Sequence, residues 1–408
     1  MQDFMEQIAQ GSLNLLDGGK GKLKIIASGD FCPVNRVETL CREGNISAVY
    51  NDAMVLLQGG DIGIINLECP LTDKPNPIRK EGPNLMAHPD CLAALSQGGF
   101  NVVTLANNHI MDHDQNGLTQ TIDECNRRCI KTVGAGKNLH EAANPLYLEV
   151  KNTRIAILNF GEGEFSAAGD NRPGANPLDP VQNYYQIKTA QQQADLVFLV
   201  IHGGNEHTAI PSPRMVKTCR FFADLGVTAI IGHHTHHASA LELYRGTPIF
   251  YSLGNFLFDY PMPAGFSHWY EGYWIVIHIN NENLLTRIEI HPHVQCREEV
   301  GLHLLKDEEK KAFLKRIHEY SRIIHDEKLL WDHWESYCQE RRFYYLSNAF
   351  RLNRVQRLLF RNRTFFKNKK NRRHLLRLFG MYDCESHRDV IVEILRNEIT
   401  RLEKDEHY

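Results

Sequence analysis

Five apolar runs of four to six residues recur along the first 235 residues, and each ends in a short polar motif. The runs are aliphatic or β-branched without polar alternation, which is typical of parallel strands buried on both faces. The predicted strands cover 23–27, 62–65, 102–105, 196–201 and 227–231. Because the carboxyl ends of parallel strands share one edge of a sheet, we expect the polar motifs to converge at the edge of one sheet.

Helical patterns alternate with these strands. Apolar residues repeat at helical spacing within 114–134, and again after Pro213 as far as Gly226, so we predict a helix in each segment. The glycine- and proline-rich stretch 161–183 is predicted to be a long loop that covers or shapes a pocket. Two strand-like runs within 273–291 predict a hairpin that closes the main domain.

The character of the chain changes near residue 300. The predicted helices beyond it cover 305–324, 328–347, 349–360 and 390–402. We therefore expect an N-terminal extension over 1–22, an α/β domain over 23–300 and a helical region over 301–408. Residues 301–408 contain 24 Lys and Arg against 17 Asp and Glu, whereas residues 1–300 contain 22 against 32. The C-terminal region is therefore basic and the main domain acidic.

Composition places further limits on the protein. With 408 residues and 42% hydrophobic content, the chain can build a large core. Its ten cysteines include no Cys-x-x-Cys pair, which favours a reducing compartment. Acidic residues interrupt the first 23 residues, and we find neither a secretion signal nor a long apolar span. The prediction is a cytoplasmic protein.

The polar motifs at the strand ends carry the candidate chemistry. Carboxylate, amide oxygen and imidazole together suit Mn²⁺, Fe²⁺ or Zn²⁺. One acidic side chain can bridge two such ions, which favours hydrolysis. A single polar residue at a strand end is more often a cap or turn residue, but five motifs in order favour a metal site. The motifs are Ser28-Gly29-Asp30, Asn66-Leu67-Glu68, Asn107-Asn108-His109, His202-Gly203-Gly204 and His233-His234-Thr235-His236-His237.

Several neighbouring residues have weaker assignments. His233 and His237 are expected to support the site, because side chains alternate along an extended segment. Glu206, Tyr251 and Asn255 are candidates for binding substrate, although each could equally be structural. Asp112 is interpreted as an anchor for its loop.

Longer strings of residues resemble a known family. Asn66-Leu67-Glu68-Cys69-Pro70-Leu71-Thr72, the segment from Ala106 to Asp112, His202-Gly203-Gly204-Asn205-Glu206, Gly232-His233-His234-Thr235-His236 and Tyr251-Ser252-Leu253-Gly254-Asn255-Phe256 are similar to the CapA family, named for poly-γ-glutamate capsule synthesis. That family resembles calcineurin-like metallophosphoesterases. The resemblance covers roughly 23–290 and implies a metallophosphatase-like layered α/β sandwich with a helical, basic C-terminal extension.

The resemblance also implies roles for individual residues. His109 resembles a histidine that protonates a leaving group or stabilises the transition state. Cys32 stands where the metallophosphoesterase pattern has a histidine; a thiolate there could bind zinc, or the residue could simply be packed. The implied ligands of two ions are Asp30 and His236 for the first, Glu68 as the bridge, and Asn108, His202 and His234 for the second.

Two functions remain open at this point. One is a metal-dependent hydrolase that acts on a phosphoester and is associated with an anionic polymer such as poly-γ-glutamate. The other is a non-catalytic polymer- or membrane-docking component of capsule biosynthesis. Residues 341–380 contain 13 Lys and Arg and no acidic residue, which suits contact with an anionic membrane at its inner face. The alternatives for this patch are a solvated helix face or a cradle for the acidic main domain. Nucleic acid is the least favoured partner, because no nucleic-acid module accompanies the patch.

Overall fold

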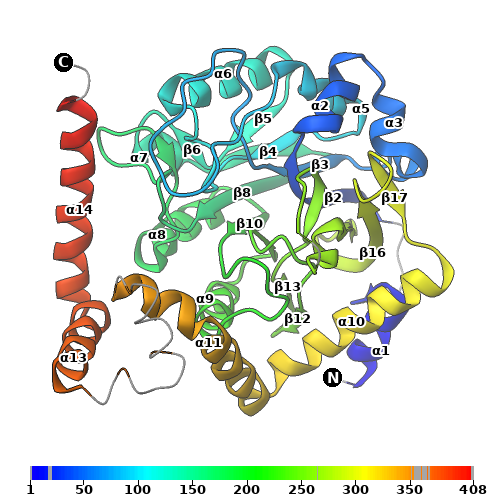
Figure 1. Cartoon of the computed structure of the whole chain (residues 1–408). Coiled ribbons are helices and arrows are strands. Elements are labelled where there is room, and N and C mark those ends of the chain that lie inside the picture. The colour runs from blue at the N-terminus through cyan, green and yellow to red at the C-terminus, as the bar shows by residue number, and fades with distance from the viewer. Residues whose placement is uncertain are drawn as a thin grey trace. The chain divides into compact units, whose positions relative to one another are not determined.

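The computed structural model describes residues 2–16, 21–263, 265–350, 352, 360, 365 and 368–405 (Figure 1). The chain divides into two compact units, residues 1–331 and residues 332–408. The predicted domain boundaries at 23 and 300 stay predictions. The candidate site lies entirely within the first unit, so the fold of that unit is described first.

The larger of two main sheets has nine strands in the order β1-β16-β15-β2-β3-β4-β5, with β14 paired to β2 and β17 to β16. Strands β2 to β5 and β14 run parallel, while β15 and β16 form the predicted antiparallel hairpin. The strands are β1 (Ser12–Asn14), β2 (Leu23–Cys32), β3 (Ile62–Leu67), β4 (Val102–Thr104), β5 (Lys131–Val133), β14 (Asn255–Phe258), β15 (Glu271–Ile279), β16 (Leu285–Gln295) and β17 (Leu302–Leu304).

The second sheet has six strands in the order β12-β13-β11-β10-β8-β7. Its four central strands, β8, β10, β11 and β13, are parallel. They are β7 (Leu146–Val150), β8 (Thr153–Gly161), β10 (Leu196–His202), β11 (Ala229–His233), β12 (Leu241–Tyr244) and β13 (Thr247–Phe250). A separate short pair joins β6 (Ala135–Gly136) to β9 (Gly174–Ala175).

The expectation that one sheet supplies every motif is wrong. The strands before the first three motifs belong to the larger sheet, and those before the last two belong to the smaller one. A parallel strand that is buried on both faces is apolar in either sheet, so the local pattern is the same for both. Sheet membership depends on which strands pair, and β8 pairs with β7 and β10 rather than with β5.

The two sheets and the helices form four layers, which confirms the predicted layered α/β sandwich (Figure 1). Inward residues of both sheets, such as Ile25, Ile64 and Phe198, share one buried cluster between the sheets. Outward residues of the larger sheet pack on α2 (Asn35–Arg42), α3 (Ile46–Tyr50), α4 (Met54–Leu57), α5 (Leu92–Gln97) and α6 (Asp114–Arg127). Those of the smaller sheet pack on α8 (Pro180–Gln191) and α9 (Pro213–Asp224). The short α7 (Leu139–Ala142) lies beside β6 and β9.

The predicted helices over 114–134 and 213–226 correspond to α6 and α9, although α6 ends at Arg127 and β5 follows it. Residues 2–16 form α1 (Gln2–Gln10) and the edge strand β1, which pairs with β16. Helix α10 (Asp307–His325) contacts α1, and both contribute to the core between the sheets through Ile8 and Phe313. The ends of the described chain in this unit are therefore packed onto the sandwich.

Three long helices complete the described chain. They are α11 (Glu327–Ala349), α13 (Lys369–Asp383) and α14 (Glu385–Asp405). The helices predicted over 328–347 and 390–402 are confirmed by α11 and α14, while most of the helix predicted over 349–360 lies outside the described residues. In the described part of the chain, no helix combines the length and the apolar content that a membrane crossing requires.

Candidate metal centre

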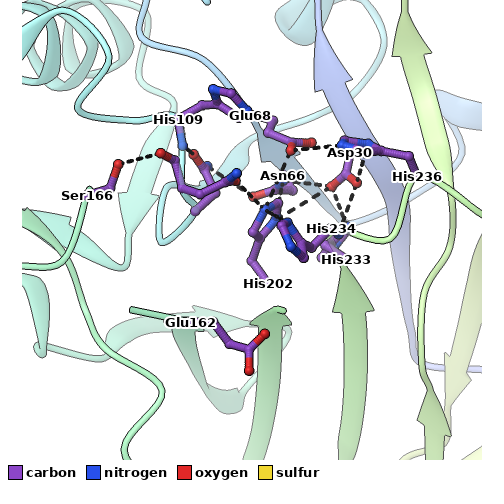
Figure 2. Close-up of polar contacts among 12 residues, drawn as sticks. Asp30, Asn66, Glu68, His109, Glu162, Ser166, His202, His233, His234 and His236 are labelled. Carbon is purple, nitrogen blue, oxygen red and sulfur yellow. Dashed lines mark hydrogen bonds and ion pairs between the residues drawn. The ribbon is translucent and has the colours of Figure 1, made fainter. Parts of the chain in front are cut away.

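Strand ends from both sheets meet at one point (Figure 2). Asp30 lies near the end of β2, and Glu68 directly follows β3 in the larger sheet. His202 ends β10 in the smaller sheet, while His234 and His236 follow β11. These five residues are at most 5% exposed, so the sandwich encloses an ionisable cluster.

Unusual backbone positions bring these side chains together. A Cβ atom on Gly29 would lie 1.9 Å from the carbonyl oxygen of Gly254, so only glycine lets β14 approach β2 beside Asp30. His234 and His236 adopt positive φ angles of 92° and 53°. Such conformations are costly for residues other than glycine, and they concentrate at functional sites.

One group of candidate ligands consists of Glu68, His202 and His234. His202 Nε2 lies 3.1 Å from His234 Nδ1 and 3.5 Å from Glu68 Oε1. Asn108 Oδ1 lies 2.9 Å from the same His202 nitrogen. Two imidazole nitrogens, an amide oxygen and a carboxylate oxygen therefore surround one small volume, as four predicted ligands of one ion would.

A second group consists of Asp30, Glu68 and His236. His236 Nε2 lies 3.6 Å from Glu68 Oε1, and His236 Nδ1 lies 3.8 Å from Asp30 Oδ2. Glu68 is the member that the two groups share. It occupies the position that a bridging carboxylate would need.

The environment of the Glu68 carboxylate indicates whether a cation fits these residues. Both of its carboxylate oxygens are buried, and neither has a hydrogen-bond partner among the described residues. Burial and the nearby carboxylate of Asp30 raise the pKa of Glu68 well above its usual range. A buried carboxylate without partners is costly, and a divalent cation would satisfy both oxygens. The residues present therefore fit a divalent metal.

The other charges in the cluster are consistent with this. Burial acts to raise the pKa of Asp30, but hydrogen bonding and charge from His233 outweigh it and hold that pKa well below its usual range. Burial lowers the pKa of His202 well below its usual range and that of His236 to about 4. Neutral imidazoles keep the lone pairs that a metal requires. His233, expected to support the site, places its Nδ1 3.1 Å from Asp30 Oδ1.

His109 lies in a polar network beside the cluster. Its Nδ1 is 2.6 Å from Asp112 Oδ2 and 3.2 Å from the Lys80 amine. Asp112 was expected to anchor its loop, and it does so by accepting a 2.7 Å hydrogen bond from the Leu85 backbone N–H. Its contact with His109 was not predicted, although an aspartate three residues after a histidine was a signal that could have suggested it. Lys80 had no such signal.

Ser166 is a further residue that the sequence did not suggest. Its hydroxyl donates a 2.7 Å hydrogen bond to the Asn108 carbonyl oxygen and accepts one of 3.3 Å from the Met111 N–H. Ser166 belongs to the glycine-rich stretch 161–183, and it is 2% exposed. This stretch therefore braces the loop that carries Asn108.

The three candidate substrate residues have different positions. Glu206 is the nearest to a substrate role, because its side chain is 48% exposed. Its partial burial acts to raise its pKa, but the imidazoles of His236 and His234 outweigh this and lower it. Tyr251 does not reach the cluster: it lies in the core under α9, and its hydroxyl bonds to Glu242. The substrate role of Tyr251 stays a prediction that this position does not support, since its hydroxyl bonds within the core of the smaller sheet.

The Asn255 side chain contacts the His236 ring and the backbone of Trp269. Its Oδ1 is 2.9 Å from His236 Nδ1, and its Nδ2 donates a 3.0 Å hydrogen bond to the Trp269 carbonyl. Asn255 is fully buried, and its predicted substrate role stays a prediction. Because its amide N–H faces Trp269, its oxygen faces His236 and accepts the Nδ1 proton. The Nε2 lone pair is then directed toward Glu68.

Cys32 is packed in the core, which was the alternative to a zinc-binding thiolate. It is fully buried in the cluster that lies between the larger sheet and its helices. Burial and the neighbouring thiol of Cys69 raise the pKa of Cys32 well above its usual range. Among the described residues Cys32 belongs to neither ligand group, so the first group has Asp30, Glu68 and His236 as its candidate ligands.

Replacing Asn255 with alanine is expected to weaken metal binding by about 10- to 100-fold, because His236 loses the partner that orients its ring. Calorimetric titration of metal-depleted protein with Mn²⁺ or Zn²⁺ measures this. Tyr251→Phe is the matched control, since it removes a buried hydroxyl outside the cluster. Equal affinity for Asn255→Ala and the parent protein would contradict the orienting role.

Comparison with known proteins places the chain in a family. Residues 24–260 match the family described as bacterial capsule synthesis protein PGA_cap, which is more than half of the chain. The chain belongs to the PGA_cap family. The resemblance to CapA proteins that the motifs indicated is thereby confirmed. The matched range contains every candidate ligand, His109 and Lys80.

Two curated relatives of this PGA_cap protein are CapA proteins from bacilli. It is 32% identical over 235 residues to the PGA biosynthesis protein CapA of Bacillus subtilis, covering 57% of this chain and 62% of that relative. It is 32% identical over 248 residues to the capsule biosynthesis protein CapA of Bacillus anthracis, covering 58% of this chain and 60% of that relative. The chain thus spans about three fifths of the length of these relatives.

Solved structures with a similar arrangement are more distant. One is the sulfate thiohydrolase SoxB of Thermus thermophilus, with a TM-score of 0.39 and 12% identity over 74% of this chain and 61% of that one. Another is a hypothetical protein from Thermus thermophilus, with a TM-score of 0.41 and 14% identity over 66% of this chain and 98% of that one.

Proposed function

We propose that this PGA_cap protein is a divalent-metal-dependent hydrolase of a phosphoester, and that it acts in the metabolism of an anionic cell-surface polymer such as poly-γ-glutamate. The polymer context comes from the family and from its CapA relatives. The reaction class comes from the chemistry of the cluster. We further propose two ions of Mn, Fe or Zn.

One observation carries the proposal: Glu68 belongs to both ligand groups and is buried with two carboxylate oxygens that have no hydrogen-bond partner among the described residues. A structural metal site would need one set of ligands. Two sets that share a carboxylate resemble the two-metal arrangement, in which bridged ions act together on a displacement reaction.

When bound, the ions would supply a nucleophile at neutral pH and stabilise the charge that develops on the attacked group. The remaining work falls to side chains. Asp30, Glu68 and the imidazoles hold the cluster in place. His109, held by Asp112 at 2.6 Å, is the group that donates a proton to the leaving oxygen. A half-exposed Glu206 contacts the substrate.

The test is to replace His109 with alanine and measure hydrolysis of alkyl phosphate mono- and diesters by the metal-loaded protein, because their alkoxide leaving groups require a proton. We expect kcat to fall by about 10²- to 10⁴-fold with metal content unchanged, because a proton donor is lost and no ligand is. The control is His88→Ala, which removes a histidine whose ion pair among the described residues is with exposed Asp90. Equal kcat for His109→Ala and the parent protein would contradict the catalytic role.

A second candidate function is supported by helix α13. Among its side chains, Leu376, Phe379 and Tyr382 are 71%, 63% and 62% exposed, and they share the helix with five Lys and Arg. Exposed apolar side chains beside basic ones suit the surface of an anionic membrane. In this alternative the protein is a non-catalytic docking component of capsule synthesis at the inner face of the membrane. A metal-loaded parent protein that hydrolyses none of the esters would favour it.

A further inference from the structure

We propose that Lys80 is a positioning residue of this site, and that its buried ammonium group fixes the orientation of the His109 imidazole through Asp112. The inference rests on the proposed function in one respect, which is that the proposed function makes His109 the proton donor. The contacts that carry it belong to the loop over residues 73–88, which follows the motif that contains Glu68. The same stretch of chain therefore delivers a candidate ligand and Lys80.

This loop is attached to the rest of the site at Asp112. The Asp112 carbonyl oxygen accepts a 3.0 Å hydrogen bond from the Ile78 N–H, and its Oδ2 accepts one of 2.7 Å from the Leu85 N–H. Its Oδ1, which accepts no hydrogen bond of normal geometry among the described residues, forms an ion pair with the Lys80 ammonium group. Contacts from both halves of the loop thus converge on one residue, Asp112: Ile78 bonds to its backbone carbonyl, and Leu85 and Lys80 contact its carboxylate.

His109 completes this network. Its Nδ1 lies 2.6 Å from Asp112 Oδ2 and 3.2 Å from Lys80 Nζ. An ammonium group only donates hydrogen bonds, and the carboxylate only accepts them. The Nδ1 proton is therefore directed to Asp112, and the ring presents Nε2 on its other side. With Lys80 on Oδ1 and His109 on Oδ2, the carboxylate cannot turn without breaking a contact.

The burial of Lys80 supports a role beyond holding the loop. Its side chain is 3% exposed and that of Asp112 is fully buried. A buried ion pair is seldom the most stable way to pack a loop, because apolar side chains of similar volume would avoid the desolvation of two charges. The Lys80–Asp112 ion pair serves instead to fix an orientation, since it holds the carboxylate that accepts the hydrogen bond from His109. Lys74, on the same loop, is exposed and makes no comparable contact with the described residues.

The test compares Lys80→Met, Lys80→Arg and Lys74→Met in protein labelled with ¹⁵N at histidine. The His109 ring signals are assigned by their loss in His109→Gln. We expect Lys80→Met to shift both ring nitrogen signals of His109. In Lys80→Arg both signals should lie close to those of the parent protein, and in Lys74→Met they should be unchanged. Unchanged His109 signals in Lys80→Met would overturn the proposal. If Lys80→Met does not fold, Lys80→Gln provides the same comparison while retaining a hydrogen-bond donor.

Kinetics provide a second readout. We expect Lys80→Met to lower kcat by about 10- to 100-fold with KM and metal content unchanged, because a small displacement of a reacting group has an effect of this size. A rise in KM with unchanged kcat would instead indicate that Lys80 binds substrate, and would overturn a positioning role. If the parent protein hydrolyses no ester, the proposed function fails, but the His109 spectra still decide the role of Lys80.

Discussion

Replacing His234 and His236 together with alanine is expected to reduce bound divalent metal from about two ions per chain to near zero. His234 belongs to the ligand group with His202, and His236 belongs to the group with Asp30, so the double variant removes an imidazole from each. A site that keeps only carboxylate and amide oxygen with at most one imidazole binds such ions far more weakly. Mass spectrometry of protein purified without chelators measures the loss.

The matched control for this experiment is His278→Ala/His291→Ala. These two histidines lie on the hairpin of β15 and β16, where both contact Glu289 and neither belongs to the cluster. The control removes the same number of imidazoles and should retain the metal of the parent protein. Equal metal loss in both double variants, or full retention in His234→Ala/His236→Ala, would contradict the assigned ligand sets.

Metal is also expected to stabilise the folded protein through Glu68. At a free metal concentration 100 times Kd, binding of one ion adds about 2.7 kcal/mol to the free energy of unfolding, which raises the melting temperature by roughly 3–4 °C. In Glu68→Gln the shared carboxylate is absent from both ligand groups, so this rise should nearly disappear. The metal-depleted variant should be no less stable than the metal-depleted parent, because it no longer buries a carboxyl group that has no hydrogen-bond partner among the described residues.

Glu242→Gln is the control for the loss of a buried glutamate. Glu242 is 2% exposed, but it forms an ion pair with Arg220 and accepts a hydrogen bond from Tyr251. This variant should melt at a lower temperature both with and without metal, and it should keep the full rise on adding metal. The two glutamates thus have opposite expected signatures in a thermal melt with Mn²⁺ or Zn²⁺. A full rise in Glu68→Gln would show that Glu68 does not bind metal.

The strands and many of the helices could be predicted because their signals are local. An unbroken aliphatic run identifies a buried strand such as β10, and helical spacing after a proline identifies α9. The polar motif at each strand end could be recognised for the same reason. The residue types at those positions were sufficient to indicate oxygen and nitrogen ligands for a divalent metal.

Side-chain direction was harder to predict than position. Tyr251 and Asn255 are four residues apart and received the same assignment, but Tyr251 bonds to Glu242 in the core while Asn255 holds His236. Which side of the strand region each one faces depends on how β13 and β14 join different sheets. Lys80 comes 29 residues before His109 in a polar loop without a pattern, so its contact with His109 could not be inferred.

Local sequence was therefore enough for the element types, the ligand chemistry and the family resemblance, because each depends on residues that are close together along the chain. The packing of two sheets was needed to show which of those residues meet. The His234 N–H donates to Asp30 Oδ2 across 204 positions of sequence, from one sheet to the other. No local pattern encodes such a contact, since it arises only when the buried faces of both sheets pack into one core.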